Sequence, residues 1–314
     1  MTPVGGSSLN PIPISDSPQK ETGTPSASKL ENTQACCSIA LLPTKLPSTL
    51  PGLNKKSIKL LQYKQQRLKS PDSQTHQLQE FCDPNSEAYG GLKNAVDATL
   101  VFAQVEAGTA VCISSEGLLL TCSHCIAESD EALDMGKVWW LLFASGRIVQ
   151  ARTVKWDARR DLALLQIMAA QPPLPATAHT TPTQQSPFPC VPLAPAPPPL
   201  RTPLLCIGHP GSEDLEIGRP GVETGYDVLH VSDGKFCGYA KGQDRQDNSE
   251  IGALKHDCWT YWGHSGGPLV ARGRNGEGEE WGLVALHSSW DEETGMRRGV
   301  GWEAISGFLR EVEG

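Results

Sequence analysis

The 314-residue sequence contains no run of about 18 apolar residues, so it offers no candidate transmembrane helix. Its first residues lack the basic start and the apolar core of a secretory signal peptide. We therefore expect an intracellular protein, cytoplasmic or nuclear, that does not span a membrane. In such a reducing compartment its ten cysteines are expected to be free thiols rather than a disulfide framework.

The sequence also has no excess of positive charge. Its 27 Lys and Arg residues are outnumbered by 35 Asp and Glu residues, which gives a net charge of −8. Residues 1–85 hold nine of the basic and six of the acidic residues (+3), which leaves 18 against 29 (−11) for the remainder. Nucleic acids bind surfaces that are rich in Lys and Arg. Bulk nucleic-acid binding by the folded part is therefore not expected.

Proline is absent from residues 86–171 and rare after residue 203, although the chain has 25 prolines in all. Ten lie in the first 85 residues and twelve in residues 172–203. The two proline-poor stretches together are long enough for one domain with a substantial core. We expect one interrupted domain rather than several independent ones.

The expected boundaries follow from this composition. Residues 1–86 are predicted to be a disordered extension rich in Ser and Pro, because such a composition buries too little apolar surface to offset the loss of chain entropy. Residues 87–314 form the predicted domain, with a first half at 87–171 and a second half with a closing helix at 204–314. Between the halves, the proline-rich insert 172–203 is expected to be an extended surface loop.

One segment of the extension differs from its surroundings. Residues 55–69 carry six basic residues and no acidic one, with Ile58, Leu61 and Leu68 near helical spacing. The pattern is typical of a solvated helix, and it is also compatible with a basic patch for an anionic partner.

The foldable stretches consist of short β-type runs separated by glycine, at spacings that favour an all-β barrel over βαβ units. Near the end of the chain Ile305, Phe308, Leu309 and Val312 recur at i, i+3, i+4 and i+7, which predicts a helix over 303–313. The strands are expected at 97–105, 109–114, 118–121, 137–143, 147–156, 162–168, 204–207, 228–231, 234–240, 268–271 and 281–287.

Ser265 lies in the motif Trp-Gly-His-Ser-Gly-Gly-Pro-Leu-Val that covers residues 262–270. Glycines allow a sharp turn that brings backbone N–H groups close to a reacting atom. The motif therefore indicates a nucleophile beside an oxyanion hole, provided that a base and an orienting carboxylate exist elsewhere in the chain.

Both partners have candidates in the first half. His124 follows an apolar strand within a cluster of small polar residues, which places it at the rim of a barrel. Asp161 lies in a charged turn that leads directly into the apolar run Leu-Ala-Leu-Leu at 162–165. The order along the chain is thus His, Asp, Ser.

These motifs resemble the chymotrypsin-like, or trypsin-fold, serine peptidases, and within them the HtrA/Deg-type branch. Residues 108–124, with a glycine, two short strands and the His, are similar to the segment that carries the catalytic His of that branch. The segments 206–211, 282–288 and 299–302 are similar to its later strands. The resemblance implies two antiparallel six-stranded β-barrels, a C-terminal helix and, because the sequence ends soon after that helix, no PDZ domain.

The resemblance also implies roles for single residues. Ser265 would attack the peptide carbonyl, His124 would transfer the proton, and Asp161 would orient the imidazole. The backbone N–H groups of Gly263 and Ser265 would form the oxyanion hole.

The same resemblance implies the borders of a substrate pocket that accepts a protein or peptide. Those border residues would be Trp259, Ser288, Ser289 and Trp290.

No cofactor or metal is expected. Cys122 and Cys125 have zinc-like spacing, but the chain lacks a second pair with matching spacing. A different class of function stays open, namely a catalytically silent peptidase-like scaffold that works through its tails. The aromatic residues Trp259, Tyr261 and Trp262 just before the nucleophile are the feature that suggests it.

Overall fold

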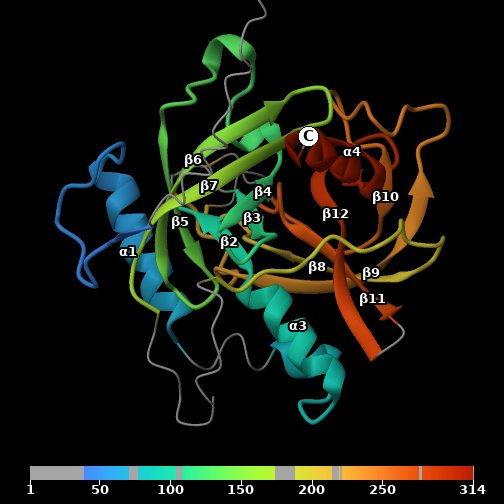
Figure 1. The fold of residues 1–314 in the computed structure, drawn as a ribbon, viewed down its shortest axis with the longest axis horizontal. Coiled ribbons are helices and arrows are strands. Elements are labelled where there is room, and N and C mark those ends of the chain that lie inside the picture. The colour runs from blue at the N-terminus through green and yellow to red at the C-terminus, as the bar shows by residue number, and fades with distance from the viewer. Residues whose placement is uncertain are drawn as a thin grey trace, which may run out of the picture. The chain divides into compact units, whose positions relative to one another are not determined.

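The computed structural model describes residues 39–70, 77–103, 108–173, 188–213, 219, 221–275 and 278–313. Its main feature is a pair of closed antiparallel barrels, one in each half of the chain (Figure 1). The two six-stranded barrels that the sequence predicts are therefore confirmed.

In the first barrel six strands are hydrogen-bonded in the order β7-β4-β3-β2-β5-β6, and pairing of β6 with β7 closes the ring. Its strands carry buried aliphatic and aromatic side chains such as Leu120, Leu164 and the almost completely buried Trp140. The strands are β2 (Thr99–Phe102), β3 (Thr109–Cys112), β4 (Leu118–Thr121), β5 (Val138–Phe143), β6 (Ile148–Asp157) and β7 (Leu162–Ala170).

The second barrel is closed in the order β10-β13-β12-β11-β8-β9. One of its strands, β10, was not expected from the sequence, because it has only three residues. Strand β13 was expected only from the family resemblance of residues 299–302, not from an apolar pattern. The two expected runs at 228–231 and 234–240 merge into one strand, β9. The bounds are β8 (Pro203–Gly208), β9 (His230–Tyr239), β10 (Leu254–His256), β11 (Pro268–Asn275), β12 (Gly278–Trp290) and β13 (Arg297–Gly301).

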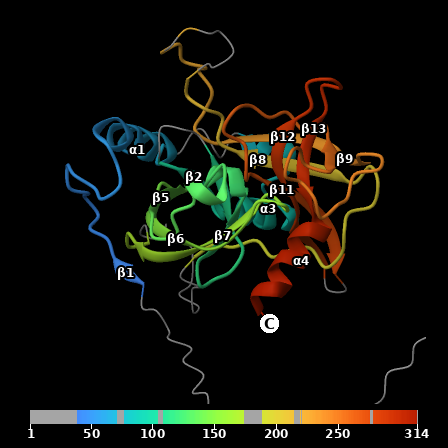
Figure 2. The ribbon, with the colours of Figure 1, turned by 90° about the horizontal axis from the view of Figure 1, so that it is seen from above.

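A C-terminal helix, α4 (Trp302–Glu313), follows β13 directly and confirms the predicted closing helix. Its apolar face, which includes Ile305 and Phe308, is buried. From above, α4 and the strands β12 and β13 lie in the same half of the molecule (Figure 2). No helix of the described residues is long and apolar enough to cross a membrane.

The N-terminal extension was expected to be disordered, and this prediction is wrong for residues 39–70. Helix α1 (Lys55–Leu68) begins at Asn54, whose side chain accepts a hydrogen bond from the Ser57 N–H at 2.8 Å. Ile58, Leu61 and Leu68 are buried in the core that includes the first barrel. The apolar spacing in the basic segment therefore marks a packed helix face rather than a solvated helix. Residues 1–38 lie outside the described part.

Lys64 shows how closely α1 is attached. The side chain is almost fully buried, and its Nζ donates a hydrogen bond to the Phe102 carbonyl oxygen at 2.7 Å. Burial lowers the pKa of this amine to about 7. The N-terminal segment is also attached to the first barrel by strand β1 (Ala40–Leu41), which pairs in parallel with the end of β7.

The proline-rich insert also differs from the surface loop that was expected. Its residues 174–187 lie outside the described part, but Phe188 and Val191 are buried. The Phe188 ring stacks on Phe143 at a centroid distance of 5.8 Å. A bridge between Leu193 and Leu283 then carries the chain to the second barrel. Apolar residues between the prolines thus anchor the end of the insert.

The attachment of α1 predicts the effect of shortening its buried side chains. We expect Leu61→Ala to lower the free energy of unfolding by about 2–5 kcal/mol, because it leaves a cavity in the core. Gln62→Ala, at the neighbouring exposed position, should change it by less than about 0.5 kcal/mol. Urea unfolding of both variants measures the difference, and equal effects would mean that α1 does not pack in solution.

Candidate active site

Asp161 lies in the tight turn between β6 and β7 and points its carboxylate into the protein, where only 4% of the residue is exposed. Its φ of 53° is in the left-handed region, which non-glycine residues rarely adopt. One carboxylate oxygen, Oδ1, accepts bonds from Ser123 Oγ at 3.0 Å and from the His124 backbone N–H at 3.3 Å. Oδ2 accepts a bond from Ser288 Oγ at 2.7 Å.

His124 lies in a single 3-10 turn, Ser123–Cys125, directly after β4. Its Nδ1 is 2.9 Å from Asp161 Oδ1. The Trp156 indole N–H donates to the Ser123 carbonyl at 3.0 Å and so ties this turn to β6. Because the carboxylate accepts at Nδ1, that nitrogen carries the proton in the neutral ring and Nε2 is left as the basic nitrogen.

The electrostatics of this pair follow from the short contact. Partial burial of the ring opposes protonation, but the Cys125 sulfur and the Asp161 carboxylate outweigh it and raise the pKa of His124 well above its ordinary value. Burial likewise opposes the negative charge of Asp161. The hydrogen bonds from His124 and Ser288 outweigh that burial and hold the pKa of Asp161 below its ordinary value.

Ser265 lies in a turn that is pressed against the first barrel. Its carbonyl oxygen accepts from the Thr109 N–H at 2.9 Å. A Cβ on Gly266, which has φ 80°, would lie 2.1 Å from the Thr109 oxygen, and one on Gly267 would lie 2.6 Å from the Ile207 oxygen. The two glycines are therefore required by close approach of backbone, as the motif suggests.

The Ser265 hydroxyl donates a hydrogen bond to the Ser288 carbonyl oxygen at 2.9 Å. Among the hydrogen bonds within the described residues, none joins this hydroxyl to His124. Ser265 is nonetheless in the same cluster as the other two candidates, since Ser288 contacts both Ser265 and Asp161.

The backbone N–H groups of Gly263 and Ser265 donate no hydrogen bond to any residue in the described ranges. Gly263 has φ 101°, which only glycine adopts easily. Its carbonyl oxygen is held by the Thr109 hydroxyl at 2.8 Å. Two neighbouring donors without an internal acceptor are the arrangement that an oxyanion requires.

The predicted pocket residues fall into two groups. Ser288 is buried and supports Asp161, while Trp290, two residues further along β12, is 51% exposed. Ser289 lies between them and its hydroxyl is buried without a partner in the described residues. Trp259 packs in an aromatic group, with ring centroids 5.1 Å from Tyr226 and 5.6 Å from His264.

Sequence reasoning did not find Ser123 or Thr109, and it gave Ser288 only as a border of the substrate pocket. Ser123 and Ser288 both bind the Asp161 carboxylate, and Thr109 holds the turn around Ser265. The small polar cluster next to His124 was a signal for Ser123. No local signal marked Thr109, because its role arises only where the two barrels meet.

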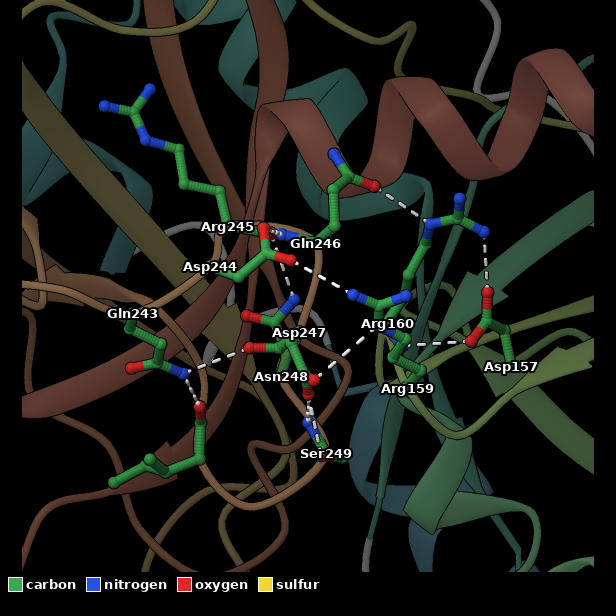
Figure 3. A network of polar contacts seen from close by, with 11 residues as sticks. Asp157, Arg159, Arg160, Gln243, Asp244, Arg245, Gln246, Asp247, Asn248 and Ser249 are labelled. Atoms are coloured by element: carbon green, nitrogen blue, oxygen red, sulfur yellow. Dashed lines mark hydrogen bonds and ion pairs between the residues drawn. The ribbon is translucent and has the colours of Figure 1, made fainter. Parts of the chain in front are cut away.

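A loop of the second barrel holds the Asp161 turn from outside (Figure 3). The buried Asn248 donates its backbone N–H to the Arg159 carbonyl at 2.7 Å and accepts from the Ala253 N–H at 2.8 Å. The Arg159 guanidinium lies 3.1 Å from Asp244. This loop therefore fixes the residues next to Asp161.

Arg160 provides the second attachment of that turn. It pairs with Asp157 at 2.7 Å and with Glu311 of α4 at 2.6 Å, and donates to Gln246 at 2.9 Å. The left-handed conformation of Asp161 is thus held by contacts on both preceding residues.

One group of side chains has the geometry for a metal, namely Cys122, His124 and Asp161, with ligand atoms within 4.8 Å of one another. Two observations weigh against a metal there. The carboxylate already accepts bonds on both oxygens, and burial, with the negative charge of Asp161 acting in the same direction, raises the pKa of the Cys122 thiol, so the thiol stays protonated.

The two closed barrels, with a His, an Asp and a Ser gathered where they meet, are the architecture of a trypsin-like serine endopeptidase. Residues 108–277 match the family described as trypsin-like peptidase domain, and the chain belongs to this family. The predicted trypsin-like peptidase family is thereby confirmed. No curated protein sequence matches the chain.

Solved structures that are similar include a serine endoprotease from Yersinia pestis, with 20% identity and a TM-score of 0.45 over 72% of this chain and 66% of that chain. An inactive-form mutant of Rv3671c from M. tuberculosis H37Rv has 16% identity and a TM-score of 0.47, over 71% of this chain and 89% of that chain. The chain thus spans slightly less than two thirds of the Yersinia chain.

The loop that carries Asn248 leads to a prediction for the site. Asn248→Ala removes the bond to Ala253 and should loosen the Asp161 turn, at a cost of about 1–3 kcal/mol in the free energy of unfolding. Because Asp161 raises the pKa of His124, a looser turn should lower that pKa. Titration of the imidazole by nitrogen NMR measures it, with the exposed Asn85→Ala as control. An unchanged His124 pKa in the folded Asn248 variant would mean that the loop does not position Asp161.

Proposed function

We propose that the chain hydrolyses peptide bonds through Ser265, His124 and Asp161. The observation that carries the proposal is the 2.9 Å contact between His124 Nδ1 and the buried Asp161 carboxylate, because it leaves Nε2 as a base at the rim of the first barrel. Ser265 would lose its proton to Nε2 as it attacks the substrate carbonyl. The imidazolium that forms would be stabilised by Asp161 and would return the proton to the leaving amine.

The Gly263 and Ser265 N–H groups supply the second part of the chemistry. They would donate to the oxyanion of the tetrahedral intermediate, and they have no acceptor within the described residues to compete for them. In related chemistry one such donor contributes about 3 kcal/mol to the transition state.

The reactive arrangement would need a different hydrogen bond at Ser265. Its hydroxyl now donates to the Ser288 carbonyl, and for the attack it would have to leave this acceptor and donate to His124 instead. The Ser288 carbonyl would then be available to accept a backbone N–H of the substrate. Catalytic hydrogen bonds often form only when substrate is present.

The same hydrogen bond favours the alternative function, a catalytically silent scaffold. If Ser265 stays on the Ser288 carbonyl, no nucleophile reaches the base, and the protein would act through its tails.

The substrate class, the cellular location and the anionic partner are likewise proposals. Substrates would be proteins or peptides, met inside the cell, where the eight described cysteines would remain the thiols they are here. An anionic partner could bind the outer face of α1, where Lys55, Lys56 and Lys59 are exposed.

A fluorophosphonate probe, which reacts with activated serines, separates the enzyme from the scaffold. The wild-type chain should form one covalent adduct at Ser265, found by mass spectrometry, and Ser265→Ala should form none. Ser115→Ala, at a serine in a turn outside the site, should label like wild type. Folded wild-type protein without an adduct would exclude the peptidase.

The raised pKa of His124 gives the sign of the pH dependence. The base must be neutral, so kcat/KM should fall as pH falls through that pKa, at a higher pH than the ordinary histidine value of about 6.5. Asp161→Asn should move this midpoint to lower pH and reduce kcat on the order of 10⁴-fold. A wild-type midpoint below about 6 would contradict the role given to Asp161.

A further inference from the structure

Arg297, the first residue of β13, contacts both segments that would border the substrate pocket. Its Nε donates to Thr260 Oγ1 at 3.2 Å, and its guanidinium carbon lies 4.8 Å from the centroid of the Trp290 ring. Thr260 directly follows Trp259, and Trp290 ends β12. One cationic side chain thus joins the two proposed walls.

The strand register sets its distance from the nucleophile. β12 runs beside the Ser265 turn, because Ser288 accepts the Ser265 hydroxyl. Trp290 lies two residues beyond Ser288 on the same strand, which is about 7 Å along the strand. It is the cross-strand partner of Arg297. A substrate side chain next to the attacked carbonyl could therefore reach the guanidinium.

The charge of Arg297 is not neutralised within the described residues. Its partners there are the Thr260 hydroxyl, the Gly295 carbonyl oxygen at 3.3 Å and the Trp290 ring. These contacts occupy two of the five N–H donors of a guanidinium. No ion pair with a carboxylate is formed, although the side chain is only half-exposed.

The neighbouring Arg298 provides an internal comparison. It is buried and donates to the Gly252 carbonyl oxygen and to Gln243, and it pairs with Asp291 at 3.1 Å. Arg298 is thus a structural arginine with its own acid. Arg297, one residue away, has N–H donors that no partner in the described residues occupies.

Among the described residues, no acidic side chain pairs with Arg297. His256, its cross-strand partner on β10, is hydrogen-bonded to His287 at 3.1 Å, and both rings are buried. Burial, reinforced by the charge of Arg297, lowers the pKa of His256 to about 3, so this ring is neutral. Asp257, the next residue, pairs with Lys235 at 3.2 Å, and Asp291, which follows Trp290, pairs with Arg298. The exposed Glu292 and Glu293 lie in the hairpin before β13 and form no ion pair with Arg297 in the described part of the chain.

We propose that the peptidase cleaves after acidic residues and that Arg297 binds the carboxylate of the substrate side chain on the acyl side of the scissile bond. The proposal rests on the peptidase function proposed above. A carboxylate matches the planar pair of donors that a guanidinium offers, and it would neutralise the local charge. A Lys or Arg side chain in the same place would be repelled.

Peptides that differ only at this one residue test the proposal. For the full chain, kcat/KM should be at least tenfold higher with Glu or Asp than with Gln or Leu, and lowest with Arg. Arg297→Gln should remove the preference for Glu over Gln. Arg310→Gln, an exposed arginine of α4, should behave as wild type. Cleavage after Leu or Gln as efficient as after Glu would overturn the proposal.

A binding measurement keeps this test separate from catalysis. Ser265→Ala cannot form the acyl-enzyme, so fluorescence polarisation on it reports recognition alone. It should bind the Glu peptide at least tenfold more tightly than the Gln peptide, and Arg297→Gln in the same background should abolish the difference. Such a preference without turnover in wild type would refute the peptidase but not the recognition. Equal binding of both peptides would refute the role of Arg297, whatever the activity.

Discussion

The buried carboxylate of Asp161 is the interaction on which the rest of the site depends. Ser123 and His124 donate to it from the first barrel, and Ser288 donates to it from the second. A negative charge with so little exposure is stable only when its lone pairs are satisfied. The carboxylate therefore requires that both barrels come together in one register, and the same register places Ser288, which also accepts the Ser265 hydroxyl, against Asp161.

This constraint explains why other parts of the chain are unusually restricted. The glycines after Ser265 are needed because this turn approaches the backbone of Thr109 in the first barrel and of Ile207 in the second. The loop around Asn248 and the α4 residue Glu311 hold the turn that keeps Asp161 in its rare conformation. Helix α1 packs against the first barrel through Lys64 and its apolar neighbours. Residues that take no part in the proposed reaction thus help to hold Asp161 and the Ser265 turn in place.

Much of the fold was predictable because its signals are local. The strands around Leu120 and Leu164, the helix through Ile305 and Phe308, and the Gly-rich turn at Ser265 each follow from spacing within a few residues. The short strand β10 was missed, because its pairing depends on neighbours distant in sequence. The extension was misjudged because Ile58, Leu61 and Leu68, although recognised at helical spacing, were attributed to a solvated helix, and the sequence does not show the core into which they pack. The proposed role of Arg297 depends on its contacts with Thr260 and Trp290. The sequence alone does not show that these three residues lie together.

The central claim is that Ser265, His124 and the two free backbone donors act on one reacting atom. A crystal structure of the full chain treated with a peptide boronate that has an acidic side chain tests it most directly. The account predicts a bond between boron and Ser265 Oγ, with one boronate oxygen about 3 Å from the Gly263 and Ser265 nitrogens and another near His124 Nε2. An unmodified Ser265 whose hydroxyl still donates to the Ser288 carbonyl, in crystals saturated with the boronate, would contradict it.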